Sequence, residues 1–243
     1  MTLKNIKIIT LSLLITLLFI GCTNQQTSGP QNDPNTSTNT TVETIVVTEE
    51  NDLVVVMSLE GMTLYSFTST KEDYDENDIL TIEFTQAEET YPLQIEPTKI
   101  MEEKDTILSM FLEVIDDLME EDAGLGKGDK ILSLDISDNL QLSTQDIEIM
   151  AQIMKNRYSF QETLTMNYEA LNAAGYIDTN DIPYFKEGLL ISITSDQGYK
   201  ESRFTFDASK YKGGLAAYFF GDCEAVYEKN DGWDYEVGYH AIS

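Results

Sequence analysis

The segment ILSMFLEVIDDLM, residues 107–119, has the apolar pattern of a helix in the middle of the chain. Its large apolar residues recur three and four positions apart, which places them on one face of a helix, whereas Glu113 and Asp117 fall on the other face. Gly124 follows as the expected end of the helical run. The segment therefore predicts an amphipathic helix that packs against another layer of structure.

Strand-like segments precede this helix. Four of them are rich in Val, Ile, Thr, Tyr and Phe and are separated by short polar turns: residues 44–48, 53–59, 62–67 and 80–84. Short turns between successive strands predict an antiparallel unit over residues 42–100. Because proline lacks an N–H group, Pro92 and Pro97 should confine the last extended piece to an edge of this unit.

Two further helices are expected after the first one. Ser143 with Asp146, and Ser159 with Glu162, have the spacing of capping boxes, which place the start of a helix. They predict helices over residues 144–158 and 160–174.

The remaining segments alternate in the way that strands do. One strand is expected over residues 130–137, and a later set is expected at residues 189–194, 202–206, 215–220, 225–228 and 233–239. Short turns again predict an antiparallel sheet. The expected fold class is thus α+β, with N-terminal antiparallel strands, central amphipathic helices and a C-terminal antiparallel sheet, and not a βαβ array.

The N-terminus has the pattern of a bacterial export signal. Lys4 and Lys7 are its only charged side chains, and residues 8–20 form an apolar run shorter than the roughly 20 residues of a spanning helix. The run ends at Gly21 and Cys22, which together resemble the lipobox of bacterial lipoproteins. This resemblance implies a lipid such as palmitate on Cys22 and localisation at the extracytoplasmic face of the cell membrane. An ordinary secretory signal with an incidental cysteine is the alternative.

The domain boundaries follow from this signal and from composition. Residues 23–41 contain no large apolar side chain, so they cannot bury surface and are expected to be a disordered tether. We therefore expect a signal peptide over residues 1–21, the lipidated cysteine and tether over 22–41, and an exported domain over 42–243. That domain could divide into subdomains at residues 42–100 and 101–243.

The chain is strongly acidic. Its 43 Asp and Glu residues outnumber 15 Lys and Arg residues, and loss of Lys4 and Lys7 with the signal peptide moves the net charge from −28 to −30. Such a field repels phosphate groups, so no nucleic-acid partner is expected, and contact with the membrane should come from the lipid on Cys22.

Few residues support the chemistry of common enzyme sites. His240 is the single histidine, which excludes a zinc site with several histidines, and Cys223 is the only cysteine after Cys22. Cys223 is interpreted as a buried packing residue. Residues 124–128 are glycine-rich but lack the spacing of a phosphate-binding loop. No cofactor is expected.

Acidic side chains leave two alternatives open. Residues 73–78 and 178–181 offer oxygen ligands without the pattern of an EF-hand loop, so they are interpreted as solvated turns, with weak Ca²⁺ binding as the alternative. A hydrolase needs only two carboxylates, and the candidates for such a pair are Asp196, Asp207, Asp222 and Glu224.

The C-terminal strands are rich in aromatic residues, which normally build a core. Alternation places Trp233, Tyr235, Val237 and Tyr239 on one face of a strand, with Trp233 as a core anchor. A second interpretation is a stacking surface for sugars, with Tyr211, Tyr218, Trp233 and Tyr235 as candidates.

These observations favour a non-enzymatic, membrane-tethered lipoprotein that binds an envelope protein or polysaccharide. A two-carboxylate envelope hydrolase is the first alternative. A solute-binding lipoprotein of a transporter is the second, although the repeated βαβ lobes of such proteins are not indicated here.

Overall fold

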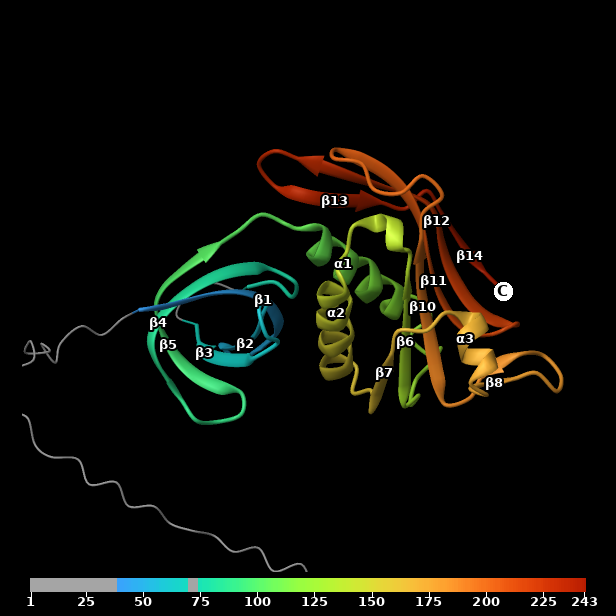
Figure 1. Ribbon diagram of the computed structural model, residues 1–243, viewed down its shortest axis with the longest axis horizontal. Helices are drawn as coiled ribbons and strands as arrows, with labels where there is room; N and C mark the ends of the chain where they lie inside the picture. Colours follow the sequence, from blue (N-terminus) through green and yellow to red (C-terminus); the bar gives the residue numbers. More distant parts are fainter. Residues whose placement is uncertain (1–38, 70–73) are drawn as a thin grey trace, which may run out of the picture. The chain divides into compact units, whose positions relative to one another are not determined.

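Strands dominate the structure. The computed structural model describes residues 39–69 and 74–243, which form a closed five-stranded barrel and a nine-stranded sheet (Figure 1). Strands account for 48% and helices for 18% of the described residues, so this part of the chain is mostly β and the expected α+β class with central helices is wrong. The helical share was overestimated partly because one expected helix is largely absent, and the strand share was underestimated because several strands continue through positions interpreted as turns.

The N-terminal strands close into a barrel in the order β1-β2-β3-β5-β4, and β4 pairs back onto β1. This order, with β3 and β5 parallel, is that of the OB fold, which hosts many unrelated ligands and assigns no function by itself. Alternate side chains such as Val46, Val56 and Ile82 fill the interior. The strands are β1 (Thr40–Glu50), β2 (Leu53–Ser58), β3 (Leu64–Thr68), β4 (Ile79–Glu88) and β5 (Leu93–Glu102).

Two expectations for this region need correction. The strand β5 lies between β3 and β4, parallel to the first and antiparallel to the second, so it is not an edge strand and the unit is not wholly antiparallel. Pro97 faces Phe84 where the register of the pair shifts, so its missing N–H falls at an irregularity of the ladder.

The barrel also revises the expected start of the folded part. Thr40 and Thr41 pair with Phe84 and Glu83, so β1 begins two residues before the expected boundary at residue 42. The signal peptide, Cys22 and the expected tether up to residue 38 lie outside the described residues.

The larger sheet follows the order β13-β12-β11-β10-β6-β7, with β14 paired to β12 and β9 to β11. The pairs from β10 to β13 are antiparallel, as expected, but β6 is parallel to both β7 and β10. The strands are β6 (Ile131–Ile136), β7 (Glu162–Leu164), β8 (Ile177–Asp178), β9 (Tyr184–Phe185), β10 (Gly188–Thr194), β11 (Arg203–Gly213), β12 (Ala216–Glu228), β13 (Gly232–Glu236) and β14 (Tyr239–Ile242).

Two of the three predicted helices are confirmed, as α1 (Ile107–Glu120) and α2 (Thr144–Arg157). The capping box of Ser143 and Asp146 is present at the start of α2. A short 3-10 helix, η1 (Asp138–Leu140), precedes α2. Because α2 connects the parallel strands β6 and β7, the sheet contains one βαβ unit that the sequence did not indicate.

The helix expected over residues 160–174 is wrong. Ser159 has a left-handed φ of 60°, Glu162–Leu164 form β7 beside β6, and only α3 (Tyr168–Ala173) is helical. Its cap is Asn167, which accepts a hydrogen bond from the Ala170 N–H. Pairing of this segment with β6 overrides the local signal at Ser159, as tertiary context often does.

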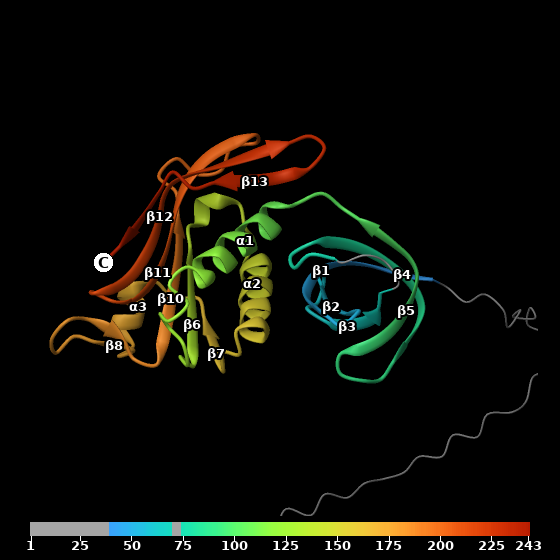
Figure 2. The ribbon, with the colours of Figure 1, turned by 180° about the vertical axis from the view of Figure 1, so that it is seen from behind.

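The helices cover the two faces of the larger sheet unequally. Figures 1 and 2 show α1 and α2 against one face and α3 with β8 at the other. On the first face, the Phe111 ring of α1 lies 5.3 Å from the Phe206 ring of β11. On the second face, Leu171 and Phe185 cover only part of the sheet, around Leu190. The rest of the second face carries a groove.

Candidate functional site

The groove has a volume of about 310 Å³ and draws its lining from four strands. Its residues are Ser192 and Thr194 of β10, Asp207, Ala208 and Ser209 of β11, Phe219, Phe220 and Gly221 of β12, and Tyr239 and Ala241 of β14. Ser192 pairs with Ser209, Ser209 with Phe219, and Phe219 with Ala241, so these residues form a row across the sheet. Rigid strands therefore fix the positions of its hydroxyl and aromatic groups.

A β-bulge in β12 determines which aromatic side chains reach the groove. Phe206 pairs with Cys223 but Ala208 pairs with Phe220, so β12 has one extra residue at Gly221 and Asp222. The extra residue reverses the alternation along the strand. As a result Phe219 faces the groove and is 36% exposed.

Tyr239 reaches the same groove for a related reason. Both β13 and β14 pair with β12, and the pairing is interrupted between them. In β14, Tyr239 pairs with Gly221. The phenol ring lies directly over Gly221 and is 53% exposed. The expected alternation therefore fails at Tyr239: Trp233 points into the core, whereas Tyr239 points into the groove.

The polar side chains of the groove are mainly hydrogen-bond acceptors and hydroxyl groups. Asp207 Oδ1 accepts a hydrogen bond of 2.8 Å from the Asp222 N–H, which holds the bulge in place. Ser192 Oγ donates to Asp135 Oδ2 at 3.5 Å. Burial raises the pKa of Asp135 above its ordinary value, while this hydrogen bond acts to lower it. The residues that line the groove include no lysine, arginine or histidine.

Three of the four aromatic residues proposed from sequence lie on the opposite, helix-covered side of the sheet. Trp233 is 7% exposed, and its ring centroid lies 5.4 Å from that of Phe204 and 5.6 Å from that of Tyr199. This position agrees with a core anchor. Tyr235 donates a hydrogen bond to Asp117 of α1. Tyr218 is also buried against the helices.

The fourth residue, Tyr211, lies on the second face but away from the groove. It donates a hydrogen bond of 3.0 Å to the Pro183 carbonyl, and its ring packs edge-on against Tyr168 at 5.6 Å. The structure therefore does not bring Tyr211, Tyr218, Trp233 and Tyr235 together. Phe219 and Tyr239, which the sequence analysis did not select, are the aromatic residues of the groove.

The four carboxylates proposed for a hydrolase pair have different surroundings. Asp207 lines the groove, whereas Glu224 forms an ion pair with Arg203 at 3.3 Å. Asp222 contributes its backbone N–H rather than its side chain to Asp207, and Asp196 is exposed in the turn after β10.

The remaining candidates from the sequence are Cys223 and the two acidic turns. Cys223 is buried as expected, and burial raises the pKa of its thiol to about 12, which makes it a poor nucleophile. Asp178 accepts hydrogen bonds from Asn180 within its turn. Residue 73 of the other acidic turn lies outside the described residues. Within the described ranges, no three His, Cys, Asp or Glu side chains are placed to hold a metal ion, and no helix is both long and apolar enough to cross a membrane.

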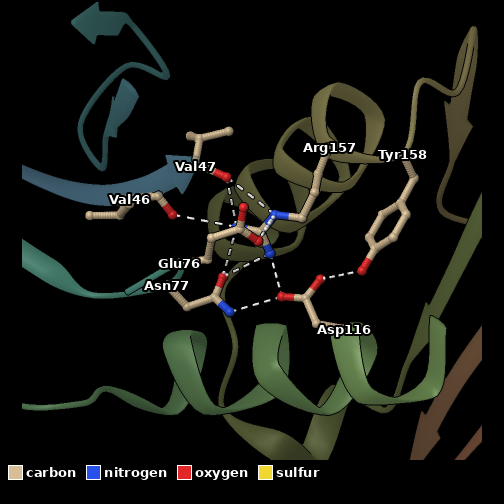
Figure 3. Close-up of polar contacts among 7 residues, drawn as sticks. All are labelled: Val46, Val47, Glu76, Asn77, Asp116, Arg157 and Tyr158. Carbon is tan, nitrogen blue, oxygen red and sulfur yellow. Dashed lines mark hydrogen bonds and ion pairs between the residues drawn. The ribbon is translucent and has the colours of Figure 1, made fainter. Parts of the chain in front are cut away.

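A second polar cluster, centred on Arg157 at the end of α2, was not anticipated (Figure 3). The Arg157 guanidinium pairs with Asp116 of α1 and with Glu76, the latter at 2.9 Å. It also donates to the Val47 carbonyl of β1 at 2.9 Å and to Asn77 Oδ1 at 3.2 Å. Because Arg157 belongs to α2, Asp116 to α1 and Val47 to β1, the cluster joins the barrel strand β1 to the two helices.

Neighbours of Arg157 complete the cluster. Asn77 Nδ2 donates to Asp116 Oδ2 at 2.9 Å, and Tyr158 Oη donates to Asp116 Oδ1 at 2.8 Å. The Arg157 side chain is only 8% exposed and that of Asp116 17% exposed. Each buried charge therefore has several partners, as buried charges require.

Comparisons with known proteins give little beyond this geometry. No family model and no curated protein matches the chain. Two solved structures match weakly. A yobA protein from Bacillus subtilis matches with a TM-score of 0.24 and 9% identity, over 28% of this chain and 99% of that one. A multidomain protein with nucleic acid binding domains from Streptococcus pneumoniae matches with a TM-score of 0.21 and 16% identity, over 60% of this chain and 46% of that one. Neither similarity carries an argument about function.

Proposed function

We propose that this chain is an exported lipoprotein, held at the extracytoplasmic face of the membrane through Cys22, whose folded part is a non-enzymatic binding module of the cell envelope. The N-terminal basic residues, the apolar run and the Gly21-Cys22 order support the lipid anchor. The groove on the larger sheet supports the binding role.

The groove is the observation that carries this proposal. Exposed aromatic side chains beside a few polar groups, all fixed on strands, are what a binding site needs to hold a ligand without reorganising. Phe219 and Tyr239 supply the apolar contact surface, and Asp207 supplies an acceptor. Binding by a preformed groove requires no histidine or metal.

The anchor is tested by labelling. Cells that express the wild-type chain or Cys22→Ala are grown with a radiolabelled fatty acid, and the protein is isolated. Label is expected on the wild type alone. Equal label in both proteins would contradict lipidation of Cys22.

The binding role is tested on isolated cell envelopes. The full-length chain, solubilised in a mild detergent, is incubated with envelopes whose membrane lipids have been extracted, so that the lipid on Cys22 has no bilayer to insert into. The bound fraction is measured by sedimentation. Tyr239→Ala should bind about tenfold more weakly, since an aromatic contact contributes about 0.5–1.5 kcal/mol beyond its buried area. Tyr91→Ala is the matched control, because Tyr91 is 85% exposed but belongs to the turn between β4 and β5 of the barrel. Equal binding by all three proteins would exclude the groove.

A further inference from the structure

The groove combines a stacking surface, a carboxylate and hydroxyl groups on one sheet face, and this combination restricts the ligand. The Tyr239 ring lies over Gly221, and Phe219 is its neighbour on β12. One face of the Tyr239 ring lies against the sheet, so its other face is free to contact the C–H groups of a flat ligand. Aromatic faces carry partial negative charge and attract such partially positive C–H groups.

The charge of the groove excludes several ligand classes. Asp207 is the ionisable carboxylate of its lining, and the lining contains no cationic side chain that could balance phosphate or carboxylate groups on a ligand. The chain as a whole carries a net charge of −28. An anionic polymer would therefore be repelled.

Apolar ligands are equally disfavoured. Beside the aromatic residues of β12 and β14, the lining contains Ser192 and Thr194 of β10 and Ser209 of β11, whose hydroxyl groups both donate and accept hydrogen bonds. Ser192 keeps its hydrogen bond to Asp135, but a hydrocarbon chain could not hydrogen-bond the hydroxyls of Thr194 and Ser209, and burying them beneath it would cost free energy. A ligand that carries hydroxyl groups of its own satisfies them.

Asp207 adds a geometric requirement. A carboxylate has about four acceptor positions, and the Asp222 N–H occupies one of them on Oδ1. The remaining positions on the two oxygens can accept hydrogen bonds from two neighbouring hydroxyl groups at once. Hydrogen bonds to a charged acceptor are about twice as strong as neutral ones.

We infer that the ligand of this groove is an uncharged saccharide with vicinal hydroxyl groups, which stacks on Tyr239 and Phe219 and donates two hydrogen bonds to Asp207. The inference rests on the proposed function, because it names the ligand class of the same groove. An extended protein segment is the competing occupant.

Two treatments of the same lipid-extracted envelopes separate these occupants. Periodate cleaves the bond between carbons that carry vicinal hydroxyls, and a protease removes polypeptide. Binding of the full-length, detergent-solubilised chain should survive protease and fall at least tenfold after mild periodate followed by borohydride. Binding that survives periodate but is lost after protease would overturn the inference and leave the proposed function intact. If untreated envelopes bind wild type and Tyr239→Ala equally, the proposed function itself fails.

Substitutions at Asp207 test its role as acceptor. Asp207→Asn keeps an oxygen that can accept from the Asp222 N–H, so the bulge should persist. It loses the charge and one of the two acceptor oxygens, and binding to protease-treated envelopes should fall about tenfold. Asp222→Asn is the matched control, because the Asp222 side chain is exposed and only its backbone contacts Asp207. Wild-type binding by Asp207→Asn would exclude the hydrogen bonds proposed for Asp207.

Discussion

The phenol ring of Tyr239 occupies the space in which any other residue at position 221 would carry its side chain. A Cβ added to Gly221 would lie 2.0 Å from Tyr239 Cζ and 2.4 Å from its hydroxyl oxygen. Because Tyr239 is half-exposed, its ring can move away while the strand stays paired. We therefore expect Gly221→Ala to remain folded and to bind envelopes about tenfold more weakly, through the lost stacking contact.

The control for this prediction is Gly124→Ala. A Cβ at Gly124 would meet its nearest neighbour, Asp122 Oδ1, at 3.7 Å, which is an ordinary contact. Thermal unfolding and envelope binding are measured for both variants. If Gly221→Ala keeps its fold and wild-type binding, Tyr239 does not contact the ligand.

The second prediction concerns Trp233. Its ring is buried among Tyr199, Phe204 and Tyr227, with centroid distances of 5.4–5.6 Å. Truncation to alanine leaves a cavity that the surrounding rings can only partly fill. Trp233→Ala should lower the free energy of unfolding by about 3–5 kcal/mol. Denaturant unfolding measures this loss, and Tyr239→Ala, which removes an exposed ring, should change the midpoint little. An unchanged midpoint for Trp233→Ala would place this side chain outside the core.

The third prediction concerns Arg157, which joins β1 to the helices. Replacing it with methionine leaves Asp116 partly buried without its cation and removes donors from the Val46 and Val47 carbonyls. Breaking a buried pair by removing one partner costs about 3–5 kcal/mol. Arg157→Met should therefore lower the free energy of unfolding by an amount in that range.

A surface ion pair supplies the comparison for Arg157. Arg203 pairs with Glu224 at 3.3 Å, and the two side chains are 62% and 40% exposed. Arg203→Met should cost no more than about 1 kcal/mol, because exposed pairs are screened by water. Similar losses for Arg157→Met and Arg203→Met in urea titrations would show that the cluster adds no special stability.

The sequence predicted the elements that depend on local signals. Helices α1 and α2 follow from helical periodicity, and the cap at Ser143 follows from a four-residue motif. Barrel closure and the parallel pairs of β6 could not be predicted, because they join segments far apart in the sequence. The Arg157 cluster has the same origin: its partners Val47, Asn77 and Asp116 lie 110, 80 and 41 positions away.

The candidate site was predicted only in part. Asp207 was selected as a carboxylate, but for a hydrolase pair. Tyr239 was assigned to the face of Trp233 because simple alternation contains no sign of the bulge at Gly221 and Asp222. A bulge changes which face follows without changing composition, so its effect on the groove became apparent only from the strand pairing.

Lys210 shows a similar limit. Alternation with Phe204, Phe206 and Ala208 places it on the core side, although a lysine normally indicates the surface. The structure buries it completely, and its ammonium group donates to carbonyl groups at the end of α1, including that of Glu121. A charge that satisfies the end of a helix cannot be identified without knowing which helix lies above it.

The fourth prediction is a pH dependence centred on Glu113 of α1. Burial, with the charges of Asp105, Asp234, Asp117 and Asp116, raises its pKa from 4.5 to about 7. The folded state thus holds a proton on Glu113 that the unfolded state releases, so the contribution of Glu113 to stability is greatest below about pH 4.5 and is lost as the pH rises through 7. Glu113→Gln stays neutral, so it should exceed the wild type by about 1 kcal/mol at pH 8, after allowance for solvent screening of a half-buried group, and by nothing at pH 4. Urea titrations at the two pH values measure the difference.

Glu120→Gln is the control for this prediction. Glu120 lies at an exposed position on the same helix, so its replacement should show no such change with pH. A Glu113→Gln effect that is independent of pH would exclude titration of Glu113 as its cause.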